Sequence, residues 1–170
     1  NGRTGRVLIQ MILRRRGLAE RVTPPVSLIL ATWARDYLAG LMGTRYVGES
    51  DSESAHAGIN LWVGRFAAAC QRAVSDSSEF EAKASTIAQK WRSTLGTVRK
   101  GSSLDTLLKG LVGMPILNVA TAMNLTRTTH KQTSEAISVL VEAGILKTMS
   151  SGKRTRVYEA PEIIASLPAL

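Results

Sequence analysis

The first six residues, NGRTGR, combine two glycines with two arginines directly before an apolar stretch, VLIQMIL. Glycines leave backbone N–H groups accessible, and the N-terminus of a helix carries partial positive charge, so both attract anions. An arginine guanidinium donates hydrogen bonds in a planar fork that fits the oxygen atoms of a phosphate. Asn1, Gly2, Arg3 and Arg6 are therefore candidate residues for binding phosphate groups.

We expect these residues to be positioned by a helix over residues 4–16, which Gly17 ends. Its apolar positions recur at helical spacing and are expected to be largely buried: Val7, Leu8, Met11 and Ile12. The cations in residues 14–17 allow two interpretations. They either complement the negative end of the helix dipole in solvent, which the pattern favours, or form a patch that binds nucleic acid.

Further helical segments fill the rest of the first hundred residues. Thr23, Pro24 and Pro25 break the chain and start the next helix. The expected ranges are 27–42, 59–74 and 80–96. The last two are one long helix if residues 75–79, which contain neither Pro nor Gly, continue it. The aromatic residues at helical spacing are interpreted as core: Trp33, Tyr37, Phe80 and Trp91.

The pattern changes after residues 97–103, TVRKGSS, which have charges, Gly and Ser but no periodic apolar positions. We therefore expect two domains, residues 1–100 and 101–170. The second should contain helices over 103–115, 116–124 and 129–144, a turn over 125–128, and strands over 145–149 and 156–160. Three helices and a basic hairpin predict a winged helix-turn-helix, in a chain that is mainly α.

Composition limits the classes of function. With 170 residues, 44% of them hydrophobic, the chain can bury a core, yet no apolar run approaches the roughly 20 residues that cross a bilayer. We therefore expect no membrane partner and a cytoplasmic location. Cys70 lies among alanines and is expected to be a small buried helix residue. His56 and His130 are far apart without cysteine partners, so no metal site is predicted.

The opening NGRTGR resembles the second half of the signature of the Fic family of nucleotidyltransferases, His-x-Phe-x-(Asp or Glu)-Gly-Asn-Gly-Arg-x-x-Arg. Asn1, Gly2, Arg3 and Arg6 fall on its Asn, Gly and two Arg positions. The remaining chain is similar to bacterial Fic proteins with a C-terminal winged helix, through VLIQMILRRRGL, INLWVGRF, VEAGIL and RVYEAPEII. The resemblance thus covers nearly the whole chain, as the C-terminal helical part of a Fic domain followed by a winged helix.

This resemblance implies a protein adenylyltransferase, which transfers AMP from ATP to a Tyr, Thr or Ser hydroxyl of a target protein. In the family the motif His is the general base and the acidic residue holds Mg²⁺ on the nucleotide; both come before the position of Asn1. The resemblance places backbone N–H groups near Gly2 on the β-phosphate and Arg6 close to the γ-phosphate. We therefore expect a part of a longer protein that is inactive alone, with ATP and Mg²⁺ as cofactors of the intact protein only.

Many members of the family are restrained by a helix with the motif (Ser or Thr)-x-x-x-Glu-(Gly or Asn), whose Glu pairs with the second motif Arg. The nearest segments here, 75–80 and 138–143, have the Ser and the Glu but lack the final Gly or Asn. No inhibitory segment is therefore expected in this chain.

The winged helix leaves two functions open. As the DNA-binding end of a transcriptional regulator, with the helical front as scaffold, it would use Arg127, Thr128, Thr129, His130, Lys131 and Ser134 in a groove and Lys153, Arg154 and Arg156 on phosphates. Alternatively, it packs against another domain or self-associates. A net charge of +9 favours polyanions, but residues 101–170 carry only +2 of it. Glu135 and Glu142 on the groove helix also argue against DNA.

Overall fold

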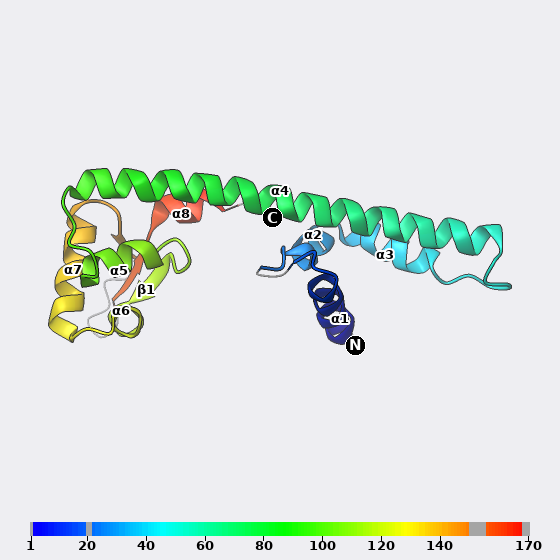
Figure 1. Ribbon diagram of the computed structural model, residues 1–170, viewed down its shortest axis with the longest axis horizontal. Helices are drawn as coiled ribbons and strands as arrows, with labels where there is room; N and C mark the ends of the chain where they lie inside the picture. The colour runs from blue at the N-terminus through cyan, green and yellow to red at the C-terminus, as the bar shows by residue number, and fades with distance from the viewer. Residues whose placement is uncertain (1, 20–21, 150–155, 168–170) are drawn as a thin grey trace. The chain divides into compact units, whose positions relative to one another are not determined.

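A computed structural model describes residues 2–19, 22–149 and 156–167, although not the side chains of Gly2 and Arg3 (Figure 1). The chain divides into two compact units, with the boundary between Glu79 and Phe80. The described residues are mainly helical and contain one small antiparallel sheet, so the predicted fold class is confirmed. None of the helices in the described residues is both long and apolar enough to span a bilayer.

The first unit is entirely helical in its described part. It contains α1 (Gly2–Arg15), α2 (Val26–Thr32), α3 (Ala34–Gly43) and the first part of α4 (Glu53–Leu95). Gly17 adopts a φ of 71° just after α1, as expected for a glycine that ends a helix. The core of this unit forms where α2 meets the middle of α4: Val26, Ile29 and Leu30 pack with Ala69 and Ala73.

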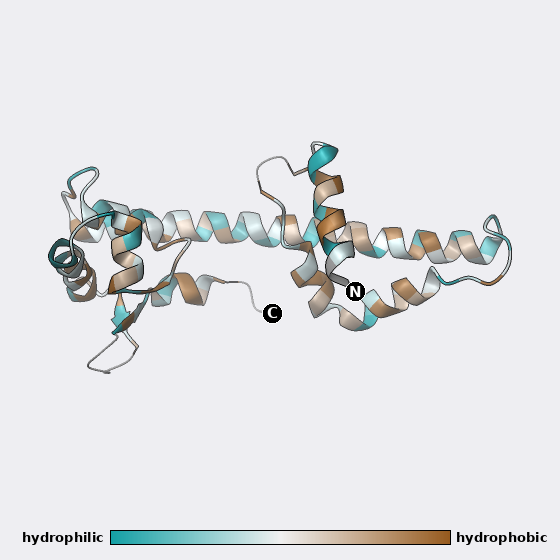
Figure 2. Ribbon diagram, turned by 90° about the horizontal axis from the view of Figure 1, so that it is seen from below, coloured by the Kyte–Doolittle hydropathy of each residue, from teal (hydrophilic) through white to brown (hydrophobic). Residues whose placement is uncertain are grey.

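The expectation that the apolar face of α1 is buried is wrong. Val7, Leu8, Met11 and Ile12 each expose about half or more of their surface. Figure 2 shows these residues as an apolar stretch in the middle turns of α1, followed by a hydrophilic last turn. Periodicity predicts which residues share a face, but it does not supply the element that covers that face. Within the described residues, no element of the first unit covers these four side chains.

The predicted helix over 27–42 is divided in two at Trp33, whose φ of −92° and ψ of 39° turn the chain between α2 and α3. The hydroxyl of Thr32 donates to the carbonyl oxygen of Leu28 at 3.0 Å. Such a bond competes with the backbone hydrogen bonds of the helix and favours a bend. The two later segments, in contrast, form the single helix α4, which resolves the alternative that the sequence left open.

A close approach of two glycines joins α3 to α4. A Cβ placed on Gly58 would overlap the backbone carbonyl of Gly43. Nearby, the guanidinium of Arg65 donates to the backbone carbonyl of Asp36 at 2.7 Å and lies 3.4 Å from the carboxylate of the same residue. The absence of side chains at both glycines therefore allows the end of α3 to lie directly against α4.

The second unit has the arrangement of a winged helix. After the last turns of α4 come α5 (Ser103–Gly110), β1 (Ile116–Asn118), α6 (Val119–Thr126), α7 (His130–Glu142), β2 (Lys147–Thr148), β3 (Val157–Glu159) and α8 (Pro161–Ser166). The strands form a sheet in the order β1-β3-β2, antiparallel throughout. Its core contains side chains from every helix of the unit, including α4.

Strand β1 lies where the sequence predicts the first residues of a helix. Ile116, Leu117 and Asn118 pair with Glu159, Tyr158 and Val157 of β3. The helix begins only after Asn118, whose side chain accepts from the backbone N–H of Thr121 at 2.9 Å. The hydroxyl of Thr121 accepts in return from the backbone N–H of Asn118, which completes a capping box. The Asn-x-x-Thr spacing was therefore the overlooked signal of a later start.

The second unit begins at Phe80 instead of residue 101 because the end of α4 belongs to its core. Trp91 is 1% exposed and Ala84 is 3% exposed, and both pack with the buried leucines of α5. Arg92, one residue further, lies 2.9 Å from the carboxylate of Asp105 on α5. The predicted break at residues 97–103 is the loop between α4 and α5.

Candidate functional sites

The Arg6 side chain, the last arginine of NGRTGR, lines a cavity of about 550 Å³ in the first unit. All four helices of this unit contribute to the cavity: Gly5, Arg6 and Ile9 from α1; Ser27, Leu30 and Ala31 from α2; Ala34, Tyr37, Leu38 and Leu41 from α3; and Trp62 from α4. Arg6 and Ile9 lie one helical turn apart, so both face the cavity. The cavity, which we call the Arg6 pocket, is therefore mostly apolar with a cation on its α1 side.

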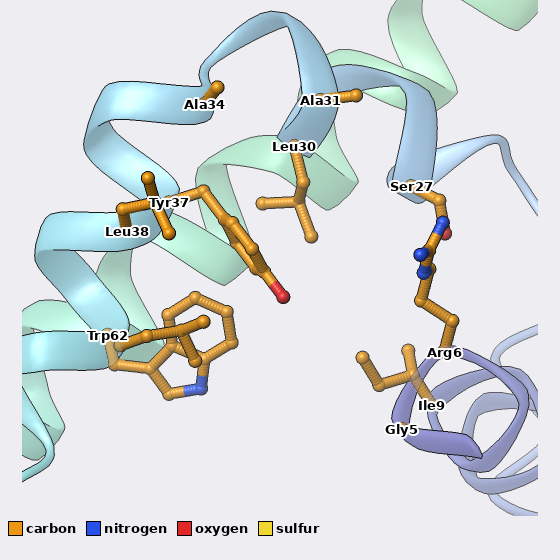
Figure 3. Close-up of a pocket in the computed structure, with 11 residues that line it drawn as sticks. Gly5, Arg6, Ile9, Ser27, Leu30, Ala31, Ala34, Tyr37, Leu38 and Trp62 are labelled. Carbon is orange, nitrogen blue, oxygen red and sulfur yellow. The ribbon is translucent and has the colours of Figure 1, made fainter. Parts of the chain in front are cut away.

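Two aromatic rings form the opposite wall of the Arg6 pocket. The rings of Tyr37 and Trp62 meet edge to face, with their centroids 5.7 Å apart and their planes at 60°. Phe66 extends the cluster, with its ring centroid 6.1 Å from that of Trp62. Figure 3 shows both rings across the cavity from Arg6, with the Tyr37 hydroxyl pointing into the space. A planar ligand could stack on such a wall while its anionic end reaches the guanidinium.

The predicted phosphate-binding residues are placed only in part. Gly2 and Arg3 lie in the first turn of α1, but the Arg3 side chain is not described, and Asn1 is outside the described residues. Tyr37 was predicted as a core residue and Trp62 was not singled out, so neither was predicted to line this pocket. No spacing in the sequence indicates that two aromatics from different helices line one cavity with an arginine on α1.

In the second unit, some of the residues predicted to contact DNA are exposed, whereas others are hydrogen-bonded within the protein. Arg127, His130 and Lys131 are exposed around the start of α7, and Arg156 is exposed just before β3. Arg127 ends α6 with a φ of 53°. Lys153 and Arg154 lie outside the described residues.

The remaining predicted groove residues hold the start of α7 in place. Thr129 is the N-cap of α7 and forms a capping box with Gln132. The Thr128 hydroxyl lies 3.0 Å from that of Ser103 on α5 and 3.1 Å from that of Thr133, which is fully buried. Ser134 is half-buried, with its hydroxyl 3.5 Å from the His130 ring. Thr128 is therefore engaged within the protein by hydrogen bonds that stabilise the turn.

Within the described residues, the structure shows neither a cluster of metal ligands nor an activated thiol. No group of three or more His, Cys, Asp or Glu side chains lies close enough to hold a metal ion there. Cys70 is half-buried, and burial raises the pKa of its thiol, which lowers its reactivity.

A scan against protein-family models and a search of curated proteins found no match to this chain.

Proposed function

We propose that the Arg6 pocket binds a nucleotide, as part of a Fic-type protein that transfers AMP from ATP to a protein hydroxyl. The observation that carries the proposal is the shared cavity, which Arg6, the second arginine of NGRTGR, lines on the side opposite the rings of Tyr37 and Trp62. The sequence motif and the pocket have Arg6 in common; the motif favours a phosphate, and the aromatic wall adds a place for a planar base.

Arg6 supplies the phosphate-binding group in this proposal. Its guanidinium lies on the second turn of α1, in a helix whose first turn contains no acidic residue. Positive charge from the helix N-terminus and from the guanidinium favours the same ligand, a phosphate oxygen. The apolar residues Leu30, Leu38 and Trp62 around the cavity lower the local polarity, which strengthens this attraction.

Tyr37 and Trp62 supply the base-binding wall. Their edge-to-face contact fixes the orientation of both rings, and a purine can stack on an aromatic face without a matching hydrogen-bond pattern. The Tyr37 hydroxyl, which points into the cavity, is available to a polar atom of the base or the ribose (Figure 3).

The transfer step in this proposal uses the motif His and the motif acid, which come before the position of Asn1 in the family signature. Neither the motif His, which would take the proton of the target hydroxyl, nor the motif acid, which would hold Mg²⁺, is present in NGRTGR. Bound Mg²⁺ would neutralise phosphate charge on the nucleotide. The exposed apolar face of α1 supports the proposal, because a preceding segment of a Fic domain would cover it.

ATP titration of the 170-residue chain, followed by tryptophan fluorescence, tests the binding site. We expect Arg6→Ala to weaken ATP binding about tenfold or more, because a hydrogen bond to a charged group contributes about 1.5–3 kcal/mol. Arg15→Ala, which removes an exposed cation from the last turn of α1, is the matched control and should bind ATP normally. Equal affinity of the Arg6 and Arg15 variants would contradict the site.

Two further measurements separate the parts of the proposal. Tyr37→Ala should weaken ATP binding but leave inorganic tripolyphosphate binding unchanged, since only ATP carries a base.

Labelled AMP should not be transferred by the 170-residue chain, whereas a chain extended by a His-x-Phe-x-(Asp or Glu)-Gly segment should transfer it. Transfer by the 170-residue chain itself would overturn the assigned roles of the missing groups.

A further inference from the structure

The observed boundary between the units changes the charge of the winged-helix unit. From Phe80 to Ala169 it contains twelve Lys and Arg against six Asp and Glu, and hence a net charge of +6. Residues 101–170, which the sequence indicated as the domain, carry only +2. The end of α4 and the following loop account for the difference. Most of the excess positive charge of the chain therefore belongs to this unit.

Several of these cations are neutralised inside the unit. Lys90 on α4 lies 3.0 Å from the carboxylate of Glu162 on α8. Arg92 and Lys109 both pair with Asp105, at 2.9 and 2.7 Å. Lys90 and Arg92 thus join two helices, whereas Lys109 pairs within α5, and all three cations are less available to an external anion.

Three other cations of this unit are different. Arg127 and Lys131 flank the start of α7, and Arg156 lies just before β3; all three are exposed, and none of them forms an ion pair with a residue in 2–19, 22–149 or 156–167. The first turn of α7 contains no acidic residue, and Glu135 and Glu142 lie in its later turns. Unpaired cations next to a helix N-terminus attract phosphate groups.

The start of α7 is anchored on its inner side and exposed on its outer side. Its inner face is buried through Thr133, Ala136, Ile137 and Leu140. The hydroxyl groups of Ser103, Thr126, Thr128 and Thr133 form a connected cluster that joins α5, the end of α6 and α7. The exposed side chains of the first turn, His130 and Lys131, therefore project from a fixed helix start.

We infer that the unit from Phe80 binds duplex DNA through the start of α7, with Arg127, Lys131 and Arg156 on the phosphates. The helix diameter fits the major groove, and the α6-turn-α7 arrangement places its first turn foremost. Thr128 has no part in the contact, because its hydroxyl is engaged in the cluster. The contact is mainly with the backbone of the duplex, so its sequence preference is small.

Fluorescence anisotropy of the 170-residue chain with a labelled random-sequence duplex, measured at several salt concentrations, tests this inference. Three phosphate contacts predict that log K falls with log salt at a slope of roughly −2 to −3, at about −0.9 per phosphate. Lys131→Gln with Arg156→Gln should reduce the slope by about 2 and the affinity at least about tenfold near 0.1 M salt. Arg35→Gln with Arg45→Gln removes equal charge from exposed positions of the first unit and should change neither quantity.

Three outcomes would overturn the inference. One is the absence of salt-dependent binding by the unchanged chain, a result that depends on no variant. Another is equal weakening by the two double variants, which would indicate attraction to net charge alone. The third is a concentration-dependent dimer in sedimentation that is lost in the Lys131 and Arg156 variant, which would assign the surface to self-association.

Discussion

Asp105 is a buried carboxylate that accepts hydrogen bonds from three partners. Its carboxylate accepts from Lys109, from the backbone N–H of Gly101 at 3.0 Å and from Arg92, while its side chain is 3% exposed. The hydrogen bond from Lys109, then those from Gly101 and Arg92, hold the pKa of this carboxyl far below its ordinary value. One side chain thus joins α4, the following loop and α5.

The unfolded chain protonates Asp105 near pH 4, well above the pH at which the folded protein does. Its contribution to stability is therefore complete above about pH 4 and is lost as the pH falls further toward the folded pKa. Asp105→Asn should lower the melting temperature at pH 7 and make it less dependent on pH between about 5 and 2.

Thermal melts by circular dichroism across this pH range measure the effect. Asp36→Asn is the control, since the Asp36 carboxylate is 67% exposed and lies 3.4 Å from Arg65. If both variants had the same pH dependence as the unchanged chain, the role assigned to Asp105 would be wrong.

The candidate sites show which site residues a sequence can predict and which it cannot. Arg6 was predicted because its motif is local, and the structure places it in a cavity. Tyr37 and Trp62 were not predicted, because their relation to Arg6 arises only when three helices pack together. Thr128 shows the opposite case, since a polar residue in a turn was expected to face a ligand, whereas its hydroxyl is hydrogen-bonded within the protein.

At the scale of the elements, the contact between α3 and α4 depends on Gly58. Gly58→Ala places a methyl group against the backbone of Gly43, so we expect a loss of about 1–3 kcal/mol in the free energy of unfolding. The change should appear as a lower urea midpoint for the first unit.

Gly64→Ala is the matched control for this prediction. Gly64 lies in the same helix, is exposed, and has no atom within 4 Å of its would-be Cβ. Alanine there should stabilise the helix by up to about 1 kcal/mol, because it restricts the unfolded chain. A destabilisation of similar size at both positions would refute the packing argument.

Elements with strong periodicity were predictable, including α1, α4 and α7. The short strand β1 was not, because three residues carry too little pattern to compete with an adjacent helix. Only the pairing with β3, some forty residues later, makes Ile116 to Asn118 a strand. The burial of α1 was predicted wrongly for a related reason, since burial depends on a partner that periodicity does not identify.

At the scale of the whole molecule, the position of the boundary is testable by truncation. A chain of residues 80–169 should unfold cooperatively, whereas a chain of residues 101–169 should be much less stable. The shorter chain lacks the buried Trp91 and Ala84, and it leaves Asp105 without Arg92.

Urea titrations of the two truncated chains, followed by far-ultraviolet circular dichroism, compare their midpoints. A chain of residues 74–169, which adds exposed helix turns but little core, is the control and should match residues 80–169. Equal midpoints for 80–169 and 101–169 would show that the end of α4 is dispensable.

The continuity of α4 also has a consequence for cooperativity. Its residues 75–79, SDSSE, are mostly exposed and contain weak helix formers, so they would not hold a helix by themselves. Helical structure there propagates from the packed turns on either side, because nucleation is costly and extension is not. Unfolding of either unit removes one of these two nuclei, so the helical middle of α4 transmits part of the stability of each unit to the other.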